Sequence, residues 1–260
     1  MCTAPDDDNG ARTTAAFKEE ERRLAAGDGA ALREFIAQPA TGFRRGAVLM
    51  IHDIWGYTEF YKDLARRITE HGYAAALVDF FGRQGDLPES MRAPERTGTR
   101  PEAMARAMKR AEQVSDERFI ADMQTAVDDL RARGARRVAC WGFCMGGRLA
   151  YVAAARGSGL AAVVGYYGHL QAPPGRLAPL ELAEEIRIPT LAIFGGADPG
   201  IPADQISAFR DALRTDKEVV TYPGAPHGFL RYGATEHKAA IDDALQRTYG
   251  FFSRVLTPAG

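Results

Sequence analysis

The sequence has few cysteines and no long apolar run, and both absences narrow the class of protein. Its three cysteines among 260 residues, Cys2, Cys140 and Cys144, are too few and too irregularly spaced for a disulfide framework. No stretch reaches the roughly 18 consecutive apolar residues that a membrane-spanning helix needs. The start of the chain is acidic at 6–8, unlike the basic start of a signal peptide. We therefore expect a cytoplasmic protein with reduced thiols and no membrane partner.

The net charge is also small, and nucleotide-binding motifs are absent from the sequence. The formal net charge is −1, from 33 basic and 34 acidic residues. This balance gives no electrostatic basis for binding nucleic acid. The phosphate-loop motif G-x-x-x-x-G-K-[ST] and the dinucleotide motif G-x-G-x-x-G do not occur. No group of His, Cys and acidic residues has the spacing of a metal site. The sequence thus predicts neither a cofactor nor a metal ion.

Short apolar runs alternating with amphipathic segments are what the sequence has in abundance. Hydrophobic residues make up 46% of the chain, enough for the core of one domain. Continuous apolar runs are typical of buried parallel strands, and helical periodicity separates them. We expect strands at 33–37, 47–51, 74–78, 137–141, 161–166, 190–194 and 218–222. This pattern predicts a flexible leader at 1–16 and a single α/β domain at 17–260, with a mostly parallel sheet covered by helices on both faces.

One connection, at 83–118, is much longer than the others. It is rich in Pro, Arg and Glu, and its middle predicts a short helix at 101–112. Connections of this length are uncommon and are usually functional or disordered. This one leaves the carboxyl end of a predicted strand, where ligands bind in such sheets. It is either a partial lid over a site or a solvated surface excursion.

The motif Gly142-Phe143-Cys144-Met145-Gly146 follows the predicted strand at 137–141. Its spacing is that of a nucleophile elbow, G-x-nucleophile-x-G, with cysteine at the place usually held by serine. Positions 142 and 146 must be small because chain segments approach each other closely in such a turn. The turn places the Cys144 sulfur at the start of the next helix, which favours a reactive thiolate. The alternative is a buried structural thiol.

Two further residues follow later strands in the order that a catalytic triad requires. Asp198 comes after the strand at 190–194, and His227 after the strand at 218–222. A thiol nucleophile needs a base, and the base needs an orienting group. The chain order nucleophile, acid, base is that of α/β-hydrolases. We expect His227 to act on Cys144 and Asp198 to hold His227; otherwise Asp198 stabilises a turn and His227 lies on a surface loop.

An oxyanion hole needs two backbone N–H groups near the nucleophile. One donor is usually the residue after the nucleophile, here Met145, and the second comes from a loop after an early strand. That loop is 52–56, and Ile54 is the candidate within it. Such donors stabilise charge that develops only in the tetrahedral intermediate.

Six motifs together resemble the dienelactone hydrolase family (carboxymethylenebutenolidases), which are α/β-hydrolases with a cysteine nucleophile. They span residues from about 30 to 255 and lie at 51–56, 78–83, 142–147, 165–168, 195–198 and 226–229. The resemblance implies hydrolysis of a lactone or other ester, typically a small carboxylate-bearing lactone, through an acyl-cysteine intermediate. It also implies that two arginines, Arg83 and Arg231, hold a substrate carboxylate, unless each is an ordinary surface residue.

Near the predicted elbow the sequence departs from the family pattern. Asp53 replaces a glutamate that contacts the resting thiol in the family's best-described members. Asp53 is therefore either a shortened version of this thiol-activating group or a structural turn residue. Trp55 and Tyr167 are candidate pocket walls, while His169 either lines the pocket or is exposed. His52 is expected to support its loop.

The sequence as a whole predicts a carboxylic-ester hydrolase that needs no cofactor and acts on a small-molecule ester or lactone. We expect a monomer or a weak homo-oligomer. Two alternatives remain open. One is an esterase or thioesterase of the same fold that acts on an unrelated ester, and the other is a non-catalytic thiol-sensing or binding protein.

Overall fold

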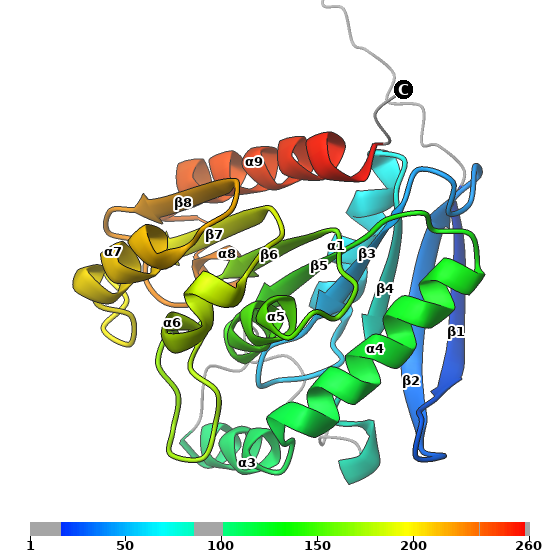
Figure 1. Ribbon diagram of the computed structural model, residues 1–260, viewed down its shortest axis with the longest axis horizontal. Helices are drawn as coiled ribbons and strands as arrows, with labels where there is room; N and C mark the ends of the chain where they lie inside the picture. The colour runs from blue at the N-terminus through cyan, green and yellow to red at the C-terminus, as the bar shows by residue number, and fades with distance from the viewer. Residues whose placement is uncertain (1–16, 86–100, 234, 258–260) are drawn as a thin grey trace, which may run out of the picture.

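A computed structural model describes residues 17–85, 101–233 and 235–257, and its described residues form one eight-stranded sheet (Figure 1). The strand order is β1-β2-β4-β3-β5-β6-β7-β8. Strand β2 is antiparallel to β1 and β4, and the other neighbouring pairs are parallel. The strands are β1 (Phe17–Ala25), β2 (Ala31–Pro39), β3 (Ala47–Ile51), β4 (Ala74–Val78), β5 (Val138–Phe143), β6 (Ala162–Tyr166), β7 (Thr190–Gly195) and β8 (Lys217–Tyr222). The mostly parallel sheet is the one predicted.

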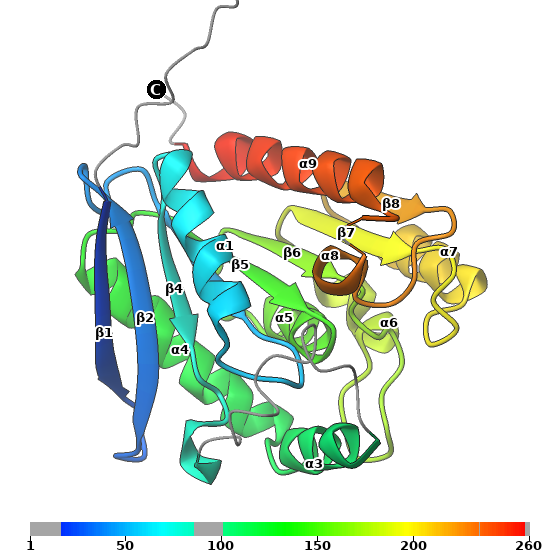
Figure 2. The same cartoon turned by 180° about the vertical axis from the view of Figure 1, so that it is seen from behind.

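Helices cover both faces of the sheet. Figures 1 and 2 show α4 and α5 on one face and α1 and α9 on the other. The helical segments are α1 (Glu59–Glu70), η1 (Gly82–Gln84), α3 (Pro101–Glu112), α4 (Asp116–Ala132), α5 (Met145–Ala155), α6 (Pro179–Leu182), η3 (Ala183–Glu185), α7 (Ala203–Ala212), α8 (Phe229–Tyr232) and α9 (Lys238–Leu256). No helix of the described residues is both long and apolar enough to cross a membrane.

The central strands are apolar along their whole length because both of their faces are covered. Every residue of β3 and of β4 is buried. Helix α1 turns one apolar face to this sheet, with Tyr61, Leu64 and Ile68 buried. It ends at Glu70, and Gly72 takes the positive φ of 81° that lets the chain turn back into β4. Burial of both sheet faces thus accounts for the uninterrupted apolar runs in the sequence.

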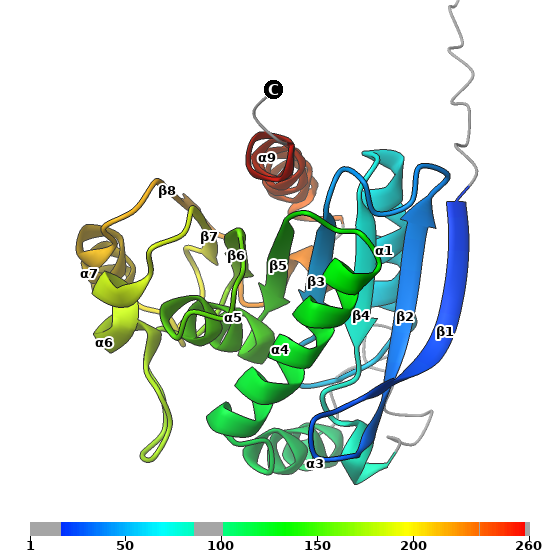
Figure 3. The same ribbon diagram turned by 45° about the vertical axis from the view of Figure 1, so that its right-hand side comes forward.

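Strand β1 was not predicted from the sequence. Its residues 17–25 are largely charged and exposed, so they show no alternation of apolar and polar positions. The strand pairs with β2 over its full length at the edge of the sheet, as Figure 3 shows. Charged side chains on an edge strand discourage pairing with other chains. The edge position explains the composition that concealed this strand.

The carboxyl ends of the parallel strands β3, β5, β6, β7 and β8 meet at one edge of the sheet, and α3 lies beside this edge (Figure 3). Helix α3 has the bounds predicted from the sequence, 101–112. The rest of the predicted excursion lies partly outside the described residues, at 86–100, as does the predicted leader at 1–16. The edge that carries these strand ends is where sheets of this type bind ligands.

Candidate active site

Cys144 lies in a sharp turn between β5 and α5. Its φ of 54° and ψ of −115° are sparsely populated for a residue with a side chain, so the surrounding structure must hold it there. A Cβ at Gly142 would lie 2.1 Å from the carbonyl oxygen of Gly146, and one at Gly146 would lie 2.4 Å from that of His52. The prediction that positions 142 and 146 must be small is confirmed. The close packing of these glycines fixes the turn that presents the sulfur.

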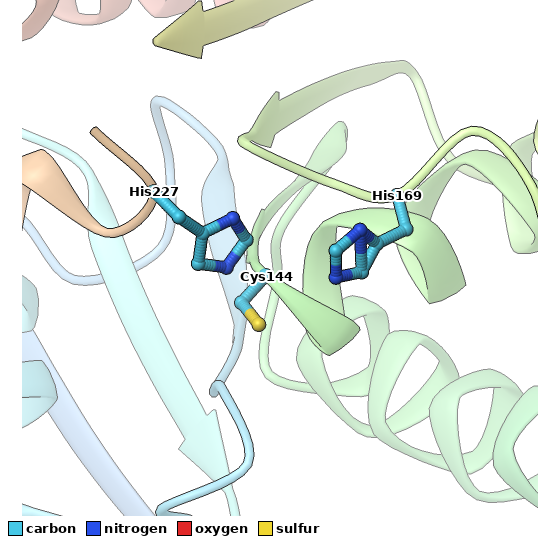
Figure 4. Close-up of side chains that lie close together, drawn as sticks. All are labelled: Cys144, His169 and His227. Atoms are coloured by element: carbon cyan, nitrogen blue, oxygen red, sulfur yellow. The ribbon is translucent and has the colours of Figure 1, made fainter. Parts of the chain in front are cut away.

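The structure brings Cys144, His227 and Asp198 together from three different loops. The Nδ1–H of His227 donates to Oδ2 of Asp198 at 2.6 Å. The backbone N–H of Gly200 donates to the other carboxylate oxygen of Asp198 at 2.9 Å. On the opposite side of the ring, Figure 4 shows one ring nitrogen turned toward the Cys144 side chain, and the donor atoms of the two residues lie within 4.8 Å of each other. The three side chains form a continuous chain from thiol to imidazole to carboxylate.

These contacts set the charge of the imidazole. Burial disfavours the charged form of His227, but the hydrogen bond to Asp198 and the proximity of Cys144 outweigh burial and raise the pKa of His227 to about 10. For Asp198, burial is likewise outweighed by the His227 ring and the Gly200 N–H, so the pKa of this carboxyl lies below its usual range. His227 is therefore an imidazolium at neutral pH, held between the carboxylate of Asp198 and the side chain of Cys144.

The two expected oxyanion donors belong to residues of the cavity that Cys144 lines. Ile54 and Met145 line the same cavity as Cys144. Met145 is the first residue of α5, so its N–H has no partner within the helix. Over 17–85, 101–233 and 235–257, no hydrogen-bond acceptor contacts the N–H of Ile54. Both N–H groups are therefore available to an oxygen that approaches Cys144.

His52 supports the loop that carries Ile54. Its Nδ1–H donates to the carbonyl oxygen of Asp53 at 2.7 Å, and its Nε2 accepts from the N–H of Phe80 at 3.2 Å. The ring is fully buried, and burial lowers its pKa. A neutral His52 thus ties the loop after β3 to the end of β4, in the supporting role expected.

A cavity of about 730 Å³ opens above Cys144. One wall is the face of α3 that carries Met104, Met108 and Ala111, and another is the loop 171–174. Ala103 and Ala107 of α3 pack against Ile54 and Trp55, which seats the helix on the edge of the site. The cavity is lined by Asp53, Ile54, Trp55, Met104, Met108, Ala111, Glu112, Val114, Cys144, Met145, Arg148, Leu149, Tyr167, His169, Gln171, Ala172, Pro173, Pro174, Arg176, Gly200, His227, Gly228, Arg231 and Tyr232. Trp55 and Tyr167 are thus wall residues, as expected.

Asp53 and Arg231 lie in the cavity wall as an ion pair. Arg231 Nη1 donates to Asp53 Oδ2 at 3.0 Å, and the Arg231 side chain is only 1% exposed. The other carboxylate oxygen of Asp53 accepts the backbone N–H of Trp55 at 2.9 Å. The Arg231 guanidinium also lies over the ring of Phe60 at 5.2 Å. Asp53 and Arg231 thus both line the cavity, as the resemblance implied, but they are bound to each other.

Arg83 requires a correction, because it does not line the cavity. It lies in η1, and its guanidinium donates to Asp122 of α4 at 2.9 Å and to Asp28 at 2.8 Å. Asp122 is buried, so this contact holds the arginine against α4. The expectation of two arginines on a substrate carboxylate is therefore not met in the described structure.

His169 is a site residue that the sequence left undecided. It follows β6 and stacks on His227, with ring centroids 5.2 Å apart and planes 12° from parallel. Figure 4 shows the Cys144 side chain beneath and between the two imidazoles. The donor atoms of Cys144, His169 and His227 lie within 4.8 Å of one another. One thiolate and two imidazoles are ligands that suit Zn²⁺, and sequence spacing concealed the group because each residue follows a different strand.

Known proteins similar to this chain share both its sequence and its fold. The model of the "Dienelactone hydrolase family" matches residues 32–256. A "Putative carboxymethylenebutenolidase" of Saccharolobus solfataricus is 30% identical over 256 residues, which cover 88% of this chain and 96% of that protein. A carboxymethylenebutenolidase of Rhodococcus opacus is 31% identical over 225 residues, or 81% of each chain.

A solved structure agrees with the sequence matches. The crystal structure titled "Putative Dienelactone Hydrolase" from Klebsiella pneumoniae superposes with a TM-score of 0.78 at 28% identity. The superposition covers 92% of this chain and 99% of that one. Together with the family match over most of the chain, these similarities establish the relationship. The chain is a hydrolase with the α/β-hydrolase fold and belongs to the dienelactone hydrolase family.

Proposed function

We propose that this chain hydrolyses carboxylic esters or lactones through an acyl-cysteine intermediate on Cys144. The observation that carries the proposal is the position of the His227 imidazole, which is hydrogen-bonded to Asp198 on one side and lies beside Cys144 on the other, with donor atoms within 4.8 Å. The names of the similar proteins, carboxymethylenebutenolidases, support lactone or ester hydrolysis.

Acylation follows from the charges at the site. His227 holds the proton of the Cys144 thiol, and the thiolate attacks the carbonyl carbon to form a C–S bond. The carbonyl oxygen takes up the negative charge and accepts hydrogen bonds from the N–H groups of Ile54 and Met145. The C–O bond to the leaving group then breaks, and His227 gives its proton to the departing oxygen. The acyl group remains on sulfur as a thioester.

Deacylation uses the same groups with water in place of the alcohol. The neutral His227 takes a proton from a water molecule as that water attacks the thioester carbonyl. The tetrahedral intermediate again rests on Ile54 and Met145, and the C–S bond breaks to release the acid. Asp198 stabilises the imidazolium in both half-reactions and keeps its ring oriented.

The proposal concerns the ester or lactone bond and does not extend to a carboxylate on the substrate. The expectation of a carboxylate-bearing lactone depended on Arg83 and Arg231. Arg83 is bound to Asp122 and Asp28 outside the cavity wall, and Arg231 is paired with Asp53.

Hydrolysis of p-nitrophenyl acetate and of cis- and trans-dienelactone by the wild type and by Cys144→Ala tests the proposal. We expect the variant to lose at least about 10³-fold in kcat, because no nucleophile replaces the sulfur. Cys140→Ala is the matched control, since Cys140 is fully buried in β5 and should leave turnover intact. Turnover that persists in Cys144→Ala would overturn the proposal. Iodoacetamide labelling of Cys144 that does not change in His227→Ala would contradict the role of His227.

A further inference from the structure

We infer that the site selects neutral esters with an apolar acyl chain over substrates that carry a carboxylate. This inference rests on the proposed function and names its substrate class. It depends on three features of the cavity: the composition of its walls, the pairing of its arginines and its size.

The wall that α3 contributes is apolar by the spacing of its residues. Met104, Met108 and Ala111 recur at helical intervals of four and three, so they lie on one face, and that face lines the cavity. Met108 is 47% exposed, one of three large apolar side chains that are exposed among the described residues. Pro173 and Pro174 of the loop after β6 extend the apolar surface. Methionine adapts its shape to varied apolar partners, which suits a wall that receives an alkyl chain.

The arginines in the cavity wall are bound to partners within the protein. Arg148 donates to both carboxylate oxygens of the buried Asp116, at 2.6 and 3.1 Å. Arg176 donates to the backbone carbonyl oxygens of Glu112 and Val114, and its Nη1 lies 3.7 Å from Asp116.

The third arginine of the wall, Arg231, is paired with Asp53. Asp53 thus pairs with Arg231, and Asp116 is shared by Arg148 and Arg176. A substrate carboxylate would have to break one of these pairs or remain unpaired beside an apolar wall, and both outcomes are unfavourable.

The side of the site on which the acyl chain lies follows from the mechanism. His227 must reach the leaving oxygen, so the leaving group lies toward His227. The carbonyl oxygen lies at Ile54 and Met145, and these residues belong to the apolar cluster that includes α3. The acyl chain is then directed along α3. A cavity of about 730 Å³ is of the size that accommodates drug-sized ligands, far larger than a five-membered lactone requires.

Two esters that differ only at the chain end test the inference. p-Nitrophenyl hexanoate and the mono-p-nitrophenyl ester of adipic acid differ by a terminal methyl against a terminal carboxylate. We expect kcat/KM to be at least about tenfold higher for the hexanoate, because the carboxylate loses its hydration without gaining a partner. We also expect kcat/KM to rise at least about tenfold from acetate to hexanoate, since each buried methylene is worth up to about fourfold.

Substitutions on α3 separate this effect from a general change in the enzyme. Met108→Lys places a cation in the cavity wall. It should lower the ratio of kcat/KM for the hexanoate to kcat/KM for the adipate ester at least about fivefold. Ala105→Lys is the matched control, because Ala105 is exposed on the same helix but does not line the cavity. The control should leave the ratio unchanged.

Each outcome distinguishes this inference from the function on which it rests. An adipate ester hydrolysed as well as the hexanoate, or equal kcat/KM for acetate and hexanoate, would overturn the inference and leave the proposed function standing. If Met108→Lys and Ala105→Lys have the same ratio of hexanoate to adipate kcat/KM, α3 does not contact the acyl chain. Absence of Cys144-dependent hydrolysis for every ester would overturn the proposed function and the inference with it.

Discussion

At the scale of single residues, the charge of His227 makes the stability of the protein depend on pH. Its pKa in the folded protein is raised to about 10 from an ordinary value of 6.5. A histidine with a raised pKa contributes stability that is fully present below pH 6.5 and is lost as the pH rises through 10. The difference in free energy of unfolding between the wild type and His227→Gln should therefore shrink as the pH rises from 6.5 to 10. Urea unfolding of both proteins at pH 6, 8 and 10 measures the difference, and a gap that widens with pH would contradict the assignment.

A second prediction at the residue scale concerns metal binding by Cys144, His169 and His227. Because their donor atoms lie within 4.8 Å of one another, micromolar Zn²⁺ should inhibit hydrolysis, with recovery on adding a chelator. His169→Ala should raise the inhibitory Zn²⁺ concentration at least about tenfold. The control is His237→Asn, at the start of α9, which should keep the wild-type sensitivity. Equal inhibition of the two variants would exclude His169 as a ligand.

The sequence predicted that Cys144, Asp198 and His227 lie together, but not the partners of the surrounding charged residues. Cys144, Asp198 and His227 each follow a parallel strand, and topology alone brings such strand ends to one edge. The partners of Arg83 and Arg231 depend on side-chain direction, which the sequence does not encode locally. Arg83 faces the buried Asp122 on a helix 39 residues further along the chain, and no local pattern indicates that pairing.

At the scale of secondary-structure elements, the turn between β5 and α5 depends on close packing of glycine. Gly142→Ala should prevent correct folding or cost more than about 3 kcal/mol, because the new methyl group would lie 2.1 Å from a backbone oxygen. Gly134→Ala is the informative comparison. Gly134 has a φ of 105°, but a methyl group added there would meet no atom of the described residues within 4 Å, so this change should cost about 1 kcal/mol. Chemical unfolding of both variants measures the contrast, and equal costs would mean that the close packing at Gly142 does not set the requirement for glycine.

The elements themselves were predicted unevenly. The buried strands follow from continuous apolar runs, because both of their faces are buried. Helix α3 follows from helical spacing, because only one of its faces is buried. Strand β1 was missed because an exposed edge strand is held by backbone pairing, which any side chains allow. The short helix α8, directly after His227, was also missed, since its four residues are too few to show a period.

At the scale of the whole molecule, one sheet contains all of the described strands. Strands from the first and last thirds of the chain are joined through β3 and β5. The chain should therefore unfold as one cooperative unit. Scanning calorimetry should give a calorimetric enthalpy equal to the van't Hoff enthalpy. Two separate transitions would contradict the prediction of a single domain.

The turn at Cys144 has a consequence for how such proteins change. Its shape is set by Gly142 and Gly146, which contact backbone atoms, and not by the atom at the end of the side chain at 144. The sulfur could therefore be exchanged for a hydroxyl oxygen without remodelling the scaffold. A single-nucleotide change converts a cysteine codon into a serine codon. One mutation could therefore replace the thiol by a hydroxyl in this fold.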